Sequence, residues 1–175
     1  MQPLFENLIF LGAGALLALC IDMGKRNHER RNTKKLLIKI IREDINLIDS
    51  EIRETKADVE ELLKMVRNPK DYLDVTKCFA FRYSIQELGQ ELFLLDEPLP
   101  KLVLQTRLSL EKFNHLYMGL VQVCNDLTRG CSSFEDRKEK LKENWCRNIL
   151  KEQVLEIKKE LNEISKNVKH LRMNL

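Results

Sequence analysis

The chain has 175 residues, of which 43% are hydrophobic and 33% charged, with a formal net charge of +3. Only six Gly and four Pro interrupt a sequence rich in Leu, Ile, Lys and Glu, a balance typical of long amphipathic helices. The excess positive charge is confined to residues 25–35, which argues against a nucleic-acid-binding protein. The five cysteines form no CxxC pair, so we expect reduced thiols in a reducing compartment.

The first predicted element is an apolar segment over residues 4–23. Residues 8–21 contain no charged side chain, and the acidic residues Glu6 and Asp22 lie near the two ends. As a helix, this window of about 20 residues has a length of about 30 Å, the hydrocarbon thickness of a bilayer. We predict a single transmembrane anchor over residues 1–24. The side chains assigned to the membrane span are Leu4, Leu8, Phe10, Leu16, Leu19 and Ile21.

The same segment has three alternative interpretations. A cleaved signal peptide requires basic residues before the apolar run, and none precedes Lys25. The sequence LALC at 17–20 resembles a bacterial lipoprotein box, although its third residue is Leu where Gly or Ala is usual. A buried helix of a soluble protein is the third alternative, and modification of Cys20 is left open. Gly14 and Ala18 would allow close approach of a second anchor helix.

A basic collar over residues 25–35 follows the predicted anchor. It contains six Lys and Arg side chains against one Glu. Because positive charge stays on the cytoplasmic side of a membrane, we predict an outside N-terminus and a cytoplasmic C-terminal domain. The same side chains would also meet anionic lipid headgroups. The residues assigned to topology and headgroup contact are Lys25, Arg26, Arg30, Arg31, Lys34 and Lys35.

A helix over about 33–68 comes next, with an apolar stripe in steps of three and four residues. This spacing predicts a coiled-coil-like seam. Leu37, Ile40 and Leu47 widen the stripe, which favours a helical bundle, while a seam between two copies is the alternative. The Asn68-Pro69 pair predicts the end of this helix. The seam residues are Ile38, Ile41, Ile45, Ile48, Ile52, Val59, Leu62 and Val66, with Thr55 as a weak position.

Two further helices are predicted over about 70–95 and 99–129. The sequence DEPLP at 96–100 indicates a tight turn between them, with Pro98 or Pro100 in the first turn of the next helix. Gly130 predicts the end of the later helix. The apolar stripe of the earlier one is Cys78, Phe81, Ile85, Leu88, Leu92 and Leu95.

The last predicted helix covers 133–173. Ser133 followed by Asp136 resembles a capping box at its start. Leu141 and Trp145 do not stay in phase with the later apolar stripe, so we expect a stutter near 146–149. Four helices joined by short turns predict an all-α fold: an antiparallel four-helix bundle over 36–175, cytosolic and attached to the N-terminal transmembrane helix.

Sites for chemistry are missing from the sequence. None of the three histidines has Glu three residues before it, as a di-iron bundle needs, and no zinc spacing or phosphate-binding loop is present. Trp145 is expected in the core. We therefore predict no enzyme, no cofactor, no metal, no nucleic acid and no small-molecule substrate.

The remaining features predict a membrane-anchored helical interaction module. It would act as a scaffold or adaptor at the cytoplasmic membrane face, with membrane lipid and either a protein partner or a second copy as its contacts. The alternatives are a sensor or effector subunit whose bundle repacks on partner binding, and a membrane-anchored dimeric coiled coil.

Overall fold

The computed structural model describes residues 2–68 and 81–175, with side chains from residue 19 onward. The helices are α1 (Gln2–Arg67), α2 (Leu99–Leu127), α3 (Phe134–Leu141) and α4 (Asn144–Met173). Two short 3-10 helices, η1 (Ser84–Gln86) and η2 (Gln90–Leu94), lie between α1 and α2. The described residues contain no strand, so the predicted all-helical class is confirmed.

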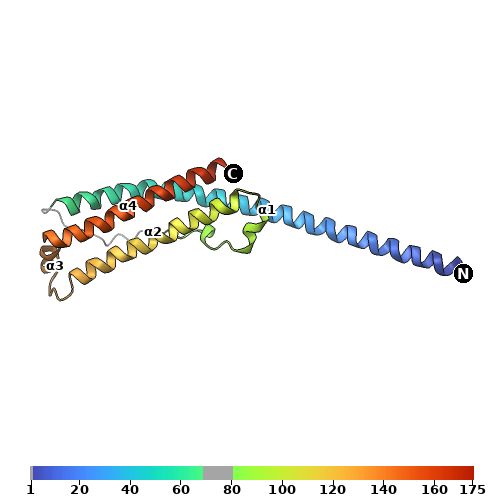
Figure 1. The fold of residues 1–175 in the computed structure, drawn as a ribbon, viewed down its shortest axis with the longest axis horizontal. Helices are drawn as coiled ribbons and strands as arrows, with labels where there is room; N and C mark the ends of the chain where they lie inside the picture. The colour runs from blue at the N-terminus through green and yellow to red at the C-terminus, as the bar shows by residue number, and fades with distance from the viewer. Residues whose placement is uncertain (1, 69–80) are drawn as a thin grey trace.

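Helix α4 packs between α1 and α2 and runs antiparallel to both (Figure 1). Along α1, the guanidinium of Arg42 donates to the backbone oxygen of Leu175 at 2.8 Å, and Lys158 pairs with Glu60 at 2.5 Å. The C-terminus therefore lies beside Arg42, at the end of the bundle from which the N-terminal part of α1 projects (Figure 1).

The core follows from the seven-residue spacing of apolar side chains on the long helices. On α4 a single stripe is at most 1% exposed, and it faces buried stripes on α1 and α2. Because residues three and four apart share one face of a helix, each stripe buries a continuous row against its neighbour. The α4 stripe is Leu150, Val154, Ile157, Leu161, Ile164, Val168 and Leu171.

The second predicted helix, over 70–95, is not formed in residues 81–95, and residues 70–80 lie outside the described part of the chain. The segment instead runs back along the bundle through η1 and η2 (Figure 1). Its apolar side chains are buried all the same: Phe81 is 2% exposed, Ile85 0% and Leu92 5%. The described bundle therefore has three long helices, and a segment with two short 3-10 helices but no α-helix takes the place of the fourth.

The segment departs from a helix because its backbone finds other partners. In a helix the Ile85 N–H would donate to the carbonyl of residue 81, whereas here it donates to the Asp44 carboxylate on α1. Gly89, between η1 and η2, adopts φ −114° and ψ −113°, a conformation outside any helix. The helical spacing of apolar residues thus predicted which side chains are buried, but this segment does not form the predicted α-helix.

The last predicted helix is divided in two. Helix α3 ends at Leu141 and α4 begins at Asn144, so the expected stutter at 146–149 is a break a few residues earlier. The capping box is confirmed, since the Asp136 N–H donates to Ser133 Oγ and the Ser133 N–H donates to Asp136 Oδ2, both at 3.1 Å. Before it, Gly130 takes a φ of 87°, which favours glycine.

At the other end, α1 continues without a break through residues 2–36 and extends far beyond the bundle (Figure 1). Among the residues whose side chains are described, no helix combines the length and the apolar character needed to cross a membrane. The predicted transmembrane part of the fold is therefore not supported. The predicted span residues Leu4, Leu8, Phe10 and Leu16 lie outside those described side chains.

Candidate functional site

The projecting part of α1 presents apolar and basic side chains to solvent. Leu19, Ile21 and Met23 are 58%, 52% and 62% exposed, although each is a large hydrophobic residue. Five of the six collar residues are exposed, and Lys34 is half-buried because it pairs with Asp96 just before α2. The described contacts place the apolar residues of this part against no other element. The exposed collar residues are Lys25, Arg26, Arg30, Arg31 and Lys35.

The predicted seam faces the interior of a single chain. Ile41, Ile48 and Val59 are at most 1% exposed, and Ile38 is half-buried against the same core. Of the flanking residues, Leu37 is buried, whereas Leu47 is 55% exposed. The remaining seam residues, each buried to at least 95%, are Ile45, Ile52, Leu62 and Val66.

Polar side chains from α1 and α2 hold the segment 81–95 in place. The Asn114 side chain pairs with both backbone groups of Phe81, accepting from its N–H and donating to its carbonyl, each at 2.9 Å. Asp44 accepts from the Ile85 N–H at 2.6 Å. Burial raises the pKa of the Asp44 carboxyl above its ordinary value, and the bond from Ile85 opposes that rise.

These two residues were missed by sequence reasoning. Asp44 lies on the seam face, between Ile41 and Ile48, where a lone carboxylate needs a hydrogen-bonding partner. That position was the available signal that a donor from another element pairs with Asp44. Asn114 carried no comparable signal, because Asn on a helix surface is common.

A buried arginine joins the start of α4 to the end of α1. Arg147 is 7% exposed, and its Nη1 donates to the carbonyls of Met65 (2.7 Å), Val66 (3.1 Å) and Asn68 (2.6 Å). Its Nε also donates to the Lys142 carbonyl at 3.2 Å. The last carbonyls of a helix have no partner within the helix, so Arg147 supplies the acceptor groups of α1 with donors.

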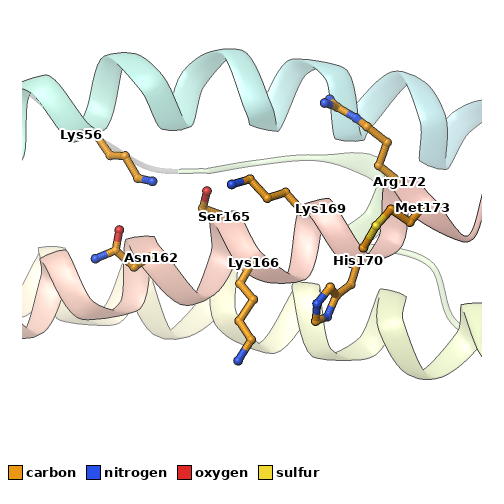
Figure 2. A pocket seen from close by; sticks show the side chains of 8 residues that line it. All are labelled: Lys56, Asn162, Ser165, Lys166, Lys169, His170, Arg172 and Met173. Carbon is orange, nitrogen blue, oxygen red and sulfur yellow. The ribbon is translucent and has the colours of Figure 1, made fainter.

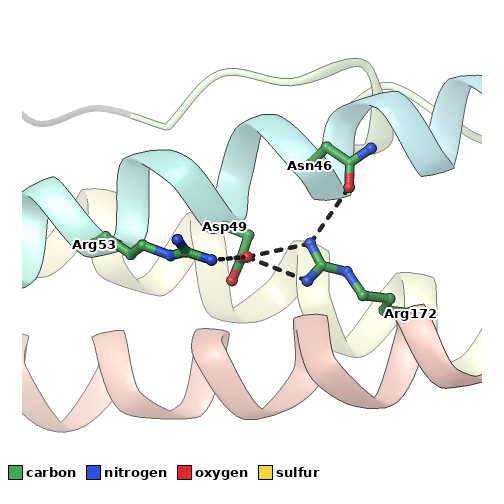
Figure 3. Close-up of polar contacts among 4 residues, drawn as sticks. All are labelled: Asn46, Asp49, Arg53 and Arg172. Carbon is green, nitrogen blue, oxygen red and sulfur yellow. Dashed lines mark hydrogen bonds and ion pairs between the residues drawn. The ribbon is translucent and has the colours of Figure 1, made fainter.

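At the opposite end of α4, Arg172 joins the helix to α1. Its guanidinium donates twice to Asp49 at 3.2 Å and once to Asn46 at 3.4 Å, while Arg53 donates to Asp49 at 3.0 Å (Figure 3). Burial alone would raise the pKa of Asp49, but the charge of Arg172 and the bonds from both arginines hold it below its ordinary value.

One residue singled out in the sequence, Trp145, has other surroundings than expected. Trp145 was predicted in the core, but it is 49% exposed and donates to the Glu143 carboxylate, with Lys140 Nζ 5.1 Å from its ring centre. The helix break before α4 turns it outward. Among the cysteines, Cys124 is buried and free, and burial together with nearby Cys146 raises the pKa of its thiol to about 12.

Metal-ligating side chains do not gather within the described part of the chain, where no three His, Cys, Asp or Glu residues are placed to hold an ion. The described arrangement thus consists of packed helices, two arginines that join α4 to α1 (Arg147 and Arg172), and a projecting helical part with apolar and basic side chains. Comparison of the chain with protein-family models, with curated proteins and with solved structures gives no match.

Proposed function

We propose that the chain is a membrane-anchored interaction module, a scaffold or adaptor whose bundle lies at the cytoplasmic face of a membrane. The observation that supports this most is the projecting part of α1. Leu19, Ile21 and Met23 are more than half exposed there, directly before six basic residues. Exposed apolar side chains of this size are unfavourable in water, so this part of the helix needs a partner, and a bilayer with the collar at its surface supplies one.

The bundle itself would act by binding, and the proposal includes no catalytic role. Its seam is filled within one chain, which favours the single-chain bundle over a dimeric coiled coil as the form in which the module works. The sequence pattern of 4–23 and the collar that follows orient the chain with its N-terminus outside and the bundle inside.

Alkaline carbonate extraction of membranes from expressing cells tests the anchor. The full chain should remain in the membrane pellet, and the double variant Leu16→Arg/Leu19→Arg should move to the supernatant, because charges at the centre of a span are costly. The matched control is Leu104→Arg/Leu108→Arg, two exposed leucines on α2, which should stay in the pellet. Extraction of the unmodified chain would contradict the proposal.

Protease protection tests the orientation. A tag placed after Leu175 should survive external protease in intact cells, while a label at Gln2 should be accessible. The reverse pattern would place the bundle outside the cytoplasm and remove the cytosolic part of the proposal.

A sensor whose bundle repacks is the second candidate, favoured by the way segment 81–95 is held. Its contacts with the helices include single polar side chains such as Asp44 and Asn114, rather than a helical face alone. On partner binding, amide exchange should then change selectively at Phe81 and Ile85. Unchanged exchange in this segment with a bound partner would eliminate the sensor role.

A further inference from the structure

A groove on the surface of α4, near the C-terminus, is lined by basic side chains. It has a volume of about 540 Å³ and extends along α4 from Asn162 to Met173, with Lys56 of α1 at its side. This size is typical of small-molecule sites. Of the described residues that line the groove, none is acidic.

Two lysines from different helices meet in this groove. Figure 2 shows Lys56 extending from α1 and Lys169 from α4, with their amino groups directed toward each other on either side of Ser165. Neither lysine has an ion-pair partner among the described residues. Two like charges facing each other repel, so the arrangement is stabilised when an anion lies between them.

Of the other lining residues, Ser165 lies between the two lysines, whereas Lys166 and His170 are directed away from them (Figure 2). Ser165 and Asn162 contribute a hydroxyl and an amide, and Lys166 lies 3.9 Å from the Glu163 carboxylate. Arg172 is fixed at the rim by Asp49. Ammonium, hydroxyl and amide donors along the groove suit a ligand with several anionic oxygens. Simple stabilisation of the C-terminal end of α4 explains basic residues on that helix, but not the lysine directed there from α1.

We propose that this groove binds a soluble, multiply phosphorylated small anion. A phosphorylated lipid headgroup has the same chemistry, but the structure favours the soluble source. About 30 Å of α1 separates Lys56 from the end of the basic collar at Lys35, because a helix rises 1.5 Å per residue. A headgroup in the membrane that the collar meets would therefore not reach the groove. Anion binding by the groove does not require the anchor, whereas the choice of the soluble source rests on the proposed position of the collar at the membrane.

Calorimetric titration of the full chain in a non-ionic detergent with inositol hexakisphosphate tests the proposal. The double variant Lys56→Gln/Lys169→Gln should bind at least about tenfold more weakly, because two charge-assisted contacts are lost. Lys56→Arg/Lys169→Arg should retain binding. The matched control Lys64→Gln/Lys101→Gln removes the same charge from exposed lysines outside the groove and should change affinity less than about twofold.

The collar needs its own control, since six basic residues attract any polyanion. Arg30→Gln/Arg31→Gln should leave the affinity of the groove unchanged. Circular dichroism should show equal helicity for all variants, and the single variant Lys169→Gln, at an exposed position, provides the same comparison if the double variant is unstable.

Three outcomes would overturn the proposal. The first is no binding by the unmodified chain, and the second is equal weakening by the groove and control variants. The third is binding only to vesicles that contain phosphatidylinositol bisphosphate, with none to the soluble phosphate. Loss of the anchor in the carbonate experiment would leave this prediction unaffected, so the two proposals can fail separately.

Discussion

Replacing Arg147 by Met removes the donors that join α4 to the end of α1 while retaining a long, largely apolar side chain. In the folded protein the guanidinium makes three bonds to the carbonyls of Met65, Val66 and Asn68 and a fourth to Lys142. A hydrogen bond that involves a charged group contributes about 1.5–3 kcal/mol. The bonds share one guanidinium, and Asn68 is exposed enough for water to replace its bond.

The loss of stability in Arg147→Met should therefore be smaller than the sum of the contributions of four separate hydrogen bonds. We expect the free energy of unfolding to fall by about 3 kcal/mol. For a domain of this size that corresponds to roughly 10 °C in the unfolding temperature. Arg147→Lys should lose less, because its ammonium can donate to the carbonyls that Nη1 reaches but has no counterpart of the Nε donor to Lys142.

Urea unfolding of residues 33–175, followed by far-ultraviolet circular dichroism, measures this change. The fragment keeps every buried hydrophobic residue described, since the first of them is Leu37. Arg137→Met is the matched control, at an exposed position on α3, and should shift stability by less than about 0.5 kcal/mol. An Arg147→Met variant as stable as this control would refute the role assigned to the guanidinium.

Three further predictions concern the seam, the segment and the acid response. Ile45→Asp or Ile52→Asp should unfold the 33–175 fragment, since burial of an Ile contributes about 2 kcal/mol and a buried charge costs more. The control Leu47→Asp, at an exposed position, should be tolerated. Sedimentation of the unmodified fragment should show a monomer, and a dimer that loses helicity on dilution would contradict the single-chain seam. Asn114→Ala should cost about 1–2 kcal/mol and raise amide exchange at Phe81, while Gln122→Ala on the exposed side of α2 should do neither. Because the pKa of Asp49 is lowered in the folded protein, the ionised carboxylate stabilises the fold above the ordinary pKa of 3.8, and this contribution is lost as pH falls below that value. Arg172→Gln should therefore flatten the acid limb of a plot of unfolding free energy against pH. An unchanged limb would argue against the Asp49–Arg172 pair.

The pKa of Asp44 is shifted upward and that of Asp49 downward, so the two carboxyl groups change stability with pH in opposite directions. Its contribution is present below the ordinary value of 3.8 and is lost as pH rises through the higher pKa of the folded state. Asp44→Asn should therefore keep an acceptor for the Ile85 N–H and remove the cost of the buried charge. The pH-dependent contributions of Asp44 and Asp49 to stability partly cancel in the unmodified protein. The variants must therefore be compared over a range of pH.

Local signals predicted the parts of the fold that local chemistry decides. The Asn68-Pro69 pair placed the end of α1 correctly, and Ser133 with Asp136 gave the start of α3. The seam spacing placed Ile41, Ile48 and Ile52 on one buried face. Each of these depends on residues within one or two turns of one another, which a sequence displays directly.

The parts that could not be predicted depend on contacts distant in sequence. Whether 81–95 is a helix is decided partly by Asp44 and Asn114, which lie on two other helices. No signal in the sequence indicated the role of Arg147, because three of its four acceptors lie about 80 positions earlier in the chain. Apolar spacing predicted burial of Phe81, Ile85 and Leu92 correctly, but spacing alone does not determine the backbone that buries them.

The proposed anchor and the bundle are joined by one helix, and its geometry decides which surface meets lipid. If the collar begins at the membrane surface, Leu37, the first buried residue among the described side chains, lies about 20 Å along α1 from Met23. Salt screens the surface potential of anionic lipids over about 8 Å at physiological ionic strength, so this potential is weak at the bundle. Lipid attraction then depends on the collar, while the basic groove on α4 and the exposed face of α2 remain available to partners in solution. Neutralising the collar should therefore weaken binding to anionic vesicles and leave the unfolding of the bundle unchanged. Neutralising the groove should change neither the binding to these vesicles nor the unfolding of the bundle.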